Sequence, residues 1–337
     1  MARRRKKKKR RITLLILEIL LLLILAAGLF VFAQLSRMGH VNVKNLIVNN
    51  GITGAKGYRN FALFGVDSRE GELASGTNSD TIIICSINRR TNDVKLVSVY
   101  RDTYLNDSTG TYRKATETYA AGGAERAISM LNMNLDLDIT DFVTVDFNAI
   151  VELVDLMGGI DLDITEEELQ WVNGYCVENQ AVTGVSYTPL ESAGYQHVNG
   201  IQALAYCRIR YTDGWDFKRT ERQRTVLLKL FDKAREQGVA SIGNLVKEML
   251  PHISTSLSTT ELISLAAGLN GYQLADNTGF PFDTAFADIS AGDVVVPVTL
   301  SSNVAKLHSF LYGEEGYVPS QTVQDISNNI INATGIQ

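Results

Sequence analysis

Cysteine and histidine are scarce in this chain of 337 residues, and their scarcity excludes some kinds of site. Three cysteines allow at most one disulfide bond. Cys85 lies in a predicted buried strand and is expected to be a small apolar residue, whereas Cys176 and Cys207 could pair, a point that the sequence leaves open. The four histidines are scattered along the chain and predict no zinc site: they are His40, His197, His252 and His308.

The chain also lacks a linker rich in proline or serine, an internal repeat, and the pattern of a serine nucleophile. The first two absences favour one continuous domain over several. Ser68 has neither a nucleophile elbow around it nor placed histidine and aspartate partners, so a serine hydrolase is not expected.

Basic residues are few outside the N-terminus. Residues 1–11 hold nine of the 32 Lys and Arg residues and no acidic residue, and Glu18 is the only acid before residue 34. Residues 34–337 therefore carry 23 basic and 36 acidic residues, a net charge of −13. An acidic body of this kind argues against a protein that binds nucleic acid.

The basic tip is followed by a long apolar run, which predicts a membrane anchor. Ile12–Phe32 is apolar apart from Thr13 and Glu18, and as a helix it would be about 31 Å long, the thickness of a bilayer core. The positive charge places residues 1–11 in the cytoplasm and everything after the anchor, residues 12–33, outside the cell. A cleaved signal peptide is the alternative, but its apolar region would be shorter.

Beyond the anchor we expect a membrane-proximal stalk, residues 34–58, and one external domain, residues 59–337. Helical patterns are predicted at 124–135, 147–157, 199–210, 219–236, 260–269 and 304–312, and a capping box at 165–168 begins another short helix. Strands are predicted at 61–66, 81–87, 94–100, 142–145, 160–164 and 294–298, with a hairpin turn at Asn92–Asp93 and an irregular loop at 174–198. This alternation predicts an α/β fold, a layered α-β-α domain with a central mixed sheet.

Polar side chains at the ends of the first two strands predict a cation site. Asp67 leaves the first strand and Asp80 enters the second, so antiparallel pairing would bring the two carboxylates to one sheet edge. Carboxylate oxygens without histidine or cysteine suit Mg²⁺ or Mn²⁺. Arg101, with Arg69 nearby, would add positive charge, and the combination describes a site for phosphate or pyrophosphate. The alternative is that the two acids only cap turns.

A second polar cluster occupies the start of the long predicted helix. Arg219, Arg222 and Gln223 share one face in its first turns. Cations at a helix N-terminus oppose the macrodipole, so local stability does not explain them, whereas an anionic ligand would. The alternative is a solvated face on which the arginines pair with nearby acids, namely Asp213, Asp216 and Glu221.

Taken in order, these stretches resemble the LytR–CpsA–Psr family of bacterial cell-envelope proteins. The matching pieces are GVDSR (65–69), SDT (79–81), RDT (101–103), Lys114 with YAAGG (119–123), the run 145–164, HVNGIQALAYCRIR (197–210) and the run 216–223. The basic tail and single anchor are also similar to that family. The chain departs from the family at Asn78, where Arg is frequent, and at Tyr100, where Pro is frequent.

The resemblance implies a membrane-anchored phosphotransferase that moves a glycopolymer, such as teichoic acid or capsular polysaccharide, from undecaprenyl pyrophosphate to peptidoglycan. By position, it implies that Asp67 and Asp80 hold the cation. It assigns the grip on the pyrophosphate to Arg101, Arg208, Arg210, Arg219 and Gln223, with supporting substrate contacts from Arg69, Lys114 and Arg222. The polyprenyl tail would need an apolar slot, which we expect between sheet and helices.

Two other functions stay open at this point. One is a membrane-anchored binding or regulatory protein that holds lipid-linked precursors without transferring them. The other is hydrolysis of the lipid pyrophosphate as a side activity. Regulation through DNA contact is not expected, because the cytoplasmic part would be only about a dozen residues long.

Overall fold

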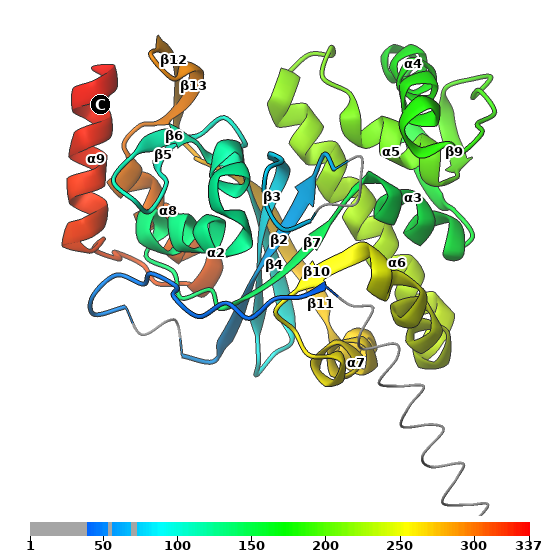
Figure 1. Cartoon of the computed structure of the whole chain (residues 1–337), viewed down its shortest axis with the longest axis horizontal. Helices are drawn as coiled ribbons and strands as arrows, with labels where there is room; N and C mark the ends of the chain where they lie inside the picture. The colour runs from blue at the N-terminus through cyan, green and yellow to red at the C-terminus, as the bar shows by residue number, and fades with distance from the viewer. Residues whose placement is uncertain (1–38, 53–55, 69–72) are drawn as a thin grey trace, which may run out of the picture.

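The computed structural model describes residues 39–52, 56–68 and 73–337, which form a mixed sheet between two groups of helices (Figure 1). The predicted anchor, residues 12–33, and Arg69 lie outside the described residues. Within the described part, no helix combines the length and the apolar character needed to cross a membrane.

The central sheet contains the three strands predicted first, and their mutual pairing is antiparallel. Outside them the sheet becomes mixed, because β7 joins β2 in parallel and β11 joins β4 in parallel. In sheet order the strands are β1 (Gly39–His40), β10 (Ile253–Thr255), β7 (Asp141–Val145), β2 (Tyr58–Val66), β3 (Ser79–Asn88), β4 (Asp93–Val99) and β11 (Gln273–Phe280). The predicted α/β fold with a central mixed sheet is therefore confirmed.

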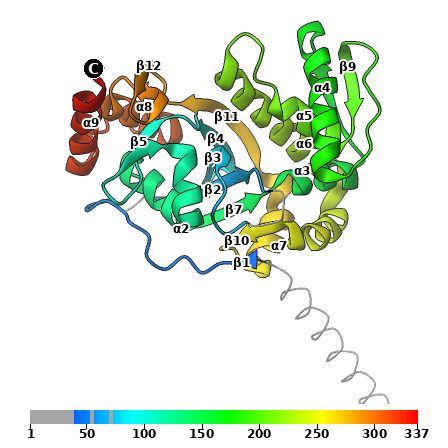
Figure 2. The ribbon, with the colours of Figure 1, turned by 45° about the horizontal axis from the view of Figure 1, so that its top comes forward.

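Helices cover both faces of this sheet. The helices are α2 (Ala115–Leu135), α3 (Phe147–Leu156), α4 (Glu166–Thr183), α5 (Gly200–Arg208), α6 (Trp215–Met249), α7 (Thr259–Gly268), α8 (Leu300–Tyr312) and α9 (Gln321–Thr334). Figure 2 shows α2, α8 and α9 on one side of the strands, and α3 to α6 on the other. Ile82 and Ile84 of β3 belong to the core beneath α2 and α8, whereas Ile83 packs with Leu227 of α6. Burial on both faces explains why these strands are continuous apolar runs.

Two turns follow directly from residue type. Asn92, with φ at +62°, makes the predicted turn between β3 and β4. Gly122 and Gly123 were expected to precede a helix, but they form a kink inside α2, which already begins at Ala115. A Cβ on Gly123 would lie 2.2 Å from the carbonyl oxygen of Ala74, so glycine permits the close passage of that segment.

The expected irregular loop at 174–198 is wrong in part. Helix α4 continues to Thr183, and β9 (Gly194–Val198) pairs with β8 (Ile160–Ile164) in a separate two-stranded sheet. The capping box at Thr165 begins α4 as predicted. Only four residues of this helix are buried, and two of them, Glu168 and Asn179, are polar, so apolar periodicity does not mark its length.

The cysteines and the predicted stalk show how tertiary packing answers questions left open by sequence. Cys176 and Cys207 are both free thiols, so the structure contains no bond between them.

Within the region predicted as a stalk, Asn49 is buried and donates hydrogen bonds to the Asp136 carboxylate and the Met133 carbonyl. Val43 also packs against the main core.

Candidate active site

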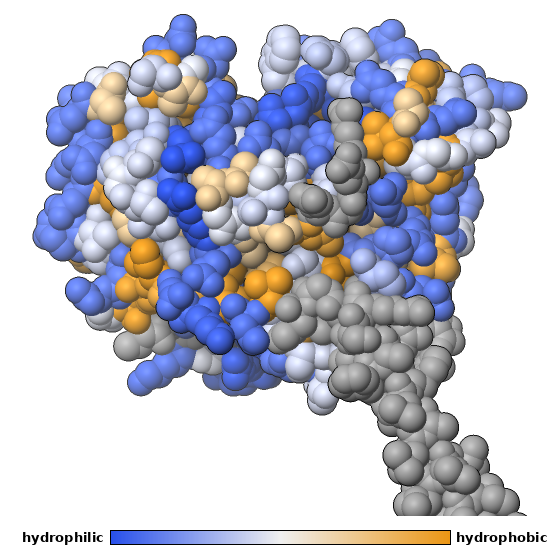
Figure 3. Space-filling view, viewed as in Figure 1, coloured by the Kyte–Doolittle hydropathy of each residue, from blue (hydrophilic) through white to orange (hydrophobic). Residues whose placement is uncertain are grey.

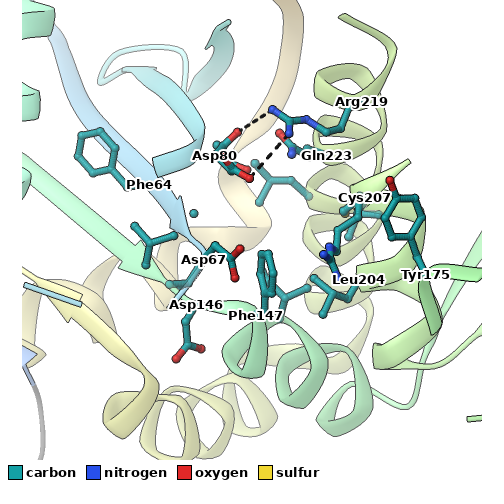
Figure 4. Close-up of a pocket in the computed structure, with 18 of the residues that line it drawn as sticks. Phe64, Asp67, Asp80, Asp146, Phe147, Tyr175, Leu204, Cys207, Arg219 and Gln223 are labelled. Atoms are coloured by element: carbon teal, nitrogen blue, oxygen red, sulfur yellow. Dashed lines mark hydrogen bonds and ion pairs between the residues drawn. The ribbon is translucent and has the colours of Figure 1, made fainter. Parts of the chain in front are cut away.

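A cavity of about 620 Å³ lies between the sheet and helices α3, α5 and α6. Most of its wall is apolar, including Leu63, Ile83, Ile150, Leu153, Leu227 and Leu230. One end is polar and contains acids and arginines (Figure 4). The cavity is at the place where an apolar slot was expected.

Asp80 is the centre of the polar end. Arg101 donates from Nη1 to Asp80 Oδ1 at 2.8 Å, and Arg210 donates from Nη2 to Oδ2 at 3.4 Å. Arg219 donates to the Asp80 backbone carbonyl at 3.3 Å. Asp67 follows β2 directly and lines the same cavity, because β2 and β3 are antiparallel and pair up to Val66. The two acids therefore stand at one sheet edge, as the sequence predicted.

Arg219 is buried in the site, with only 2% of its side chain exposed. Its Nη2 lies 2.9 Å from Asp216 Oδ1, and the Nε of Arg101 lies 3.6 Å from the same oxygen. A solvated face, the alternative considered for this arginine, is thus excluded. Asp216, considered earlier only as a surface partner, bridges two of the site arginines.

The pKa values of the site respond to burial and to these ion pairs. Burial raises the pKa of Asp80, but Arg219, Arg101 and Arg210 outweigh it and hold that pKa below its ordinary value. Asp216 differs, because burial raises its pKa and the arginines only partly oppose the rise. Burial lowers the pKa of Arg219 to about 10 despite Asp216 and Asp80, so this side chain stays protonated at neutral pH.

Several buried polar atoms at this end have no hydrogen-bond partner within the described residues. They are Asp67 Oδ1, Asp216 Oδ2, Arg101 Nε and Arg219 Nε. Buried polar atoms in proteins are nearly always paired, and each exception needs an explanation. Two of these atoms, Asp67 Oδ1 and Arg219 Nε, belong to residues that line the cavity, and the other two belong to residues that pair with Asp80 or Arg219 behind it. This end of the cavity therefore has polar groups available for a ligand.

The donor set fits a cation shared with a ligand better than a cation enclosed by protein. Asp67 has a buried oxygen free to coordinate, whereas both oxygens of Asp80 already face guanidiniums. Among the described residues no group of three or more His, Cys, Asp or Glu could hold a metal. Mg²⁺ commonly takes one or two carboxylates and completes its shell with water and phosphate oxygens, which these two acids allow.

Arg208 and Gln223, both predicted site residues, also line the cavity. The guanidinium of Arg208 donates to Asn179, and its Cζ lies 5.2 Å from the ring centroids of both Phe147 and Tyr175. These contacts hold the Arg208 side chain at the wall.

Arg101, Lys114 and Arg222 are not among the residues that line the cavity, although Arg101 reaches it through its ion pair with Asp80. Lys114 Nζ lies 3.6 Å from Asp102 Oδ1, and Asp102 in turn lies 3.4 Å from Arg101 Nε. Arg222 donates to Glu168 at 2.7 Å, to the Ile209 carbonyl and to Thr212. Its guanidinium is fully engaged with protein, so the expected substrate contact is replaced by a structural role.

Sequence reasoning missed the parts of the site that depend on neighbours distant in sequence. Asp102 follows Arg101 directly, and that adjacency was the one available signal for it. Trp171 and Tyr175 line the cavity from α4, part of which was expected to be a loop. The pairing of Asp216 with Arg101 joins residues 115 positions apart, which no local pattern reveals.

Comparison with known proteins gives relatives of this chain. TagV of Bacillus subtilis (strain 168), named a polyisoprenyl-teichoic acid–peptidoglycan teichoic acid transferase, is 27% identical over 199 residues, covering 58% of this chain and 49% of TagV. Biofilm regulatory protein A of Streptococcus mutans serotype c is 34% identical over 187 residues, covering 51% of this chain and 43% of that protein. The chain thus matches about half the length of these relatives.

Solved structures share the fold. A structure described as TagT bound to LIIa-WTA aligns with a TM-score of 0.57 at 20% identity, covering 88% of this chain and 98% of that one. The family protein YwtF (TagT) with bound octaprenyl pyrophosphate lipid aligns with a TM-score of 0.53 at 18% identity, covering 90% and 99%. A family model also matches residues 34–278, more than two thirds of the sequence. This chain belongs to the LytR_cpsA_psr family.

Proposed function

We propose that this protein transfers a glycopolymer from a polyprenyl-pyrophosphate carrier to peptidoglycan. The observation that carries the proposal is a single cavity with an apolar interior and an arginine-rich end. A lipid pyrophosphate has the same two parts, an apolar chain and a doubly charged head. The names of TagV and of the octaprenyl-pyrophosphate complex support this choice of substrate class.

The arginines are suited to binding the diphosphate head. Arg101, Arg210 and Arg219 converge on Asp80, and planar guanidiniums bind phosphate oxygens in pairs. Arg208 and Gln223 stand on the cavity wall within the same lining. The polyprenyl chain would occupy the apolar part between β2, β3 and α6.

Charge balance explains why a cation belongs to the proposal. The three arginines face three carboxylates, those of Asp80, Asp102 and Asp216, so their positive charge is largely neutralised by protein. Mg²⁺ or Mn²⁺ held by Asp67 and Asp80 would add the missing positive charge and draw electron density from the diphosphate.

The reaction needs placement and charge stabilisation more than a covalent intermediate. A hydroxyl of the acceptor sugar attacks the phosphorus that bears the glycopolymer, and its proton ends on the departing polyprenyl phosphate. The bond from that phosphorus to the bridging oxygen breaks, and polyprenyl phosphate leaves. Arg101 and Arg219 stabilise the charge that collects on the leaving phosphate.

The same proposal includes location and partners. Residues 1–11 would lie in the cytoplasm, residues 12–33 in the membrane, and the catalytic domain outside a Gram-positive type of cell, next to the membrane lipid and the cell wall. Nucleic acid is not among the proposed partners, since the body of the chain is acidic.

A binding or regulatory protein without transferase activity is the second candidate. Its support is the 34% identity to a protein named biofilm regulatory protein A. The two candidates share every ligand residue, so only chemistry separates them. The test is to incubate the full-length protein with a sugar-labelled lipid pyrophosphate, Mg²⁺ and peptidoglycan. We expect label on peptidoglycan, whereas binding without transfer or cleavage would favour the second candidate.

A further inference from the structure

Three aromatic rings contact one another in tilted pairs beside the arginine cluster but outside the cavity. The ring centroids of Tyr100 and Phe217 are 4.3 Å apart, and those of Phe217 and Phe286 are 5.9 Å apart. We call these three residues the aromatic ladder. Its inner end, Tyr100, precedes Arg101, and its outer ring, Phe286, is 70% exposed. None of the three is among the residues that line the cavity.

The outer ring is held in place by a hairpin attached to the site. Phe286 is on β12 (Thr284–Ile289), directly opposite Val295 of β13 (Gly292–Pro297). The Val295 amide donates to the Asp102 carbonyl at 2.9 Å, so the hairpin is fastened one residue from Arg101. Phe286 therefore keeps a fixed position relative to the arginines although its face is open to water.

A fourth aromatic side chain stands at the same end of the molecule. Trp215 is 69% exposed and lies directly before Asp216, which pairs with Arg219 and Arg101. Its φ is +45°, after Gly214 at +88°. A bulky residue in this region is a backbone outlier, and such strain is concentrated at functional sites.

A single exposed aromatic residue needs no explanation. This arrangement differs because the rings contact one another, one neighbour is strained, and the ladder starts next to an arginine of the reaction centre. Figure 3 shows the surface hollowed at the top, between the β12–β13 hairpin and the start of α6. The exposed, flat ring of Phe286, close to charged groups, matches a sugar ring, which has an apolar C–H face and a polar edge.

We infer that the aromatic ladder, together with Trp215, binds the sugar rings of the polysaccharide acceptor. This inference rests on the proposed function, in which the cavity is filled by the lipid and the acceptor must approach from outside it. A sugar ring stacked on the ladder would have its hydroxyl edge beside Arg101. The ladder would then determine affinity for the acceptor without changing affinity for the lipid donor.

The test compares Phe286→Ala with wild type, both as full-length protein in detergent. One assay measures binding of soluble peptidoglycan glycan strands without any donor, and a second measures transfer with acceptor and donor varied separately. For Phe286→Ala we expect acceptor KM and glycan Kd to rise at least about fivefold, with donor KM unchanged. Phe286→Trp should restore both. Tyr195→Ala, at an equally exposed ring on β9, is the matched control and should change neither.

Two outcomes would overturn the inference about the aromatic ladder. If the wild-type protein binds no glycan strands, the inference is wrong, whatever the donor chemistry shows. Equal changes in donor and acceptor KM would mean that Phe286 acts on the fold of the site. Glycan binding without transfer in wild type would instead preserve the sugar site and contradict the proposed transferase, so the two failures are distinguishable.

Discussion

Arg219 and Arg222 lie three residues apart on α6, and both are buried, yet they have different surroundings. Every nitrogen of the Arg222 guanidinium donates to a protein oxygen, on Glu168, Ile209 or Thr212. Arg219 lines the cavity and keeps its Nε unpaired. The comparison teaches that burial and residue type do not separate a structural arginine from a ligand-binding one. What separates them is whether the protein satisfies all the donors.

Loss of Arg219 should have the largest effect on activity. We expect Arg219→Ala to lower the rate of transfer by about 10³-fold or more, the scale on which a single arginine acts in phosphoryl transfer. The measurement is turnover with saturating donor and acceptor, alongside thermal unfolding. Arg222→Ala is the matched control, and a larger loss of rate per folded molecule in that variant would reverse the comparison.

Arg222→Ala should act on stability. Removal of one partner leaves the Glu168 carboxylate buried and uncompensated, which costs about 3–5 kcal/mol of unfolding free energy. Urea denaturation measures this cost. Adding Glu168→Gln to Arg222→Ala should recover part of it, and an additive further loss would show that the pair is not the source of the stability.

Asp67→Asn tests whether an unpaired buried atom also marks a ligand-binding group among the acidic residues, since Asp67 keeps a buried oxygen unpaired. We expect the Mg²⁺ concentration for half-maximal transfer to rise at least about tenfold, because even outer partners of metal ligands cost that much affinity. A magnesium titration of activity measures it. An unchanged midpoint would remove Asp67 from the proposed cation site.

The smallest expected effect is a pH-dependent difference between Asp80 and Asp216. The folded pKa of Asp80 lies below 3.8, so its ionised form stabilises the protein above that value and loses this contribution as the pH falls through the folded pKa. The pKa of Asp216 is raised, so its contribution is present below 3.8 and is lost as the pH rises through the folded pKa. Near neutral pH, Asp80→Asn should lower the Tm and Asp216→Asn should raise it. Equal signs would contradict the assignment.

Much of the fold and part of the site could be predicted from local sequence. Apolar runs bounded by Asp67, Asp80 and Arg101 define β2, β3 and β4, and the antiparallel pairing alone brings the two acids to one edge. The length of α4 could not be predicted, because two of its four buried residues, Glu168 and Asn179, are polar and are buried by contacts with α6 and α5. Their side chains give no apolar period of their own.

The sequence by itself determined the three antiparallel strands of the central sheet, the acidic edge and the presence of arginines near the start of α6, because these depend on residue type and short-range spacing. Only the tertiary structure decided that Asp216 bridges Arg101 and Arg219 and that Arg222 forms an ion pair with Glu168. It also decided that Cys176 and Cys207 are free thiols. The physical reason is that hydrogen-bond saturation and desolvation are set by neighbours far apart in the chain, and these two quantities distinguish a binding group from a structural one.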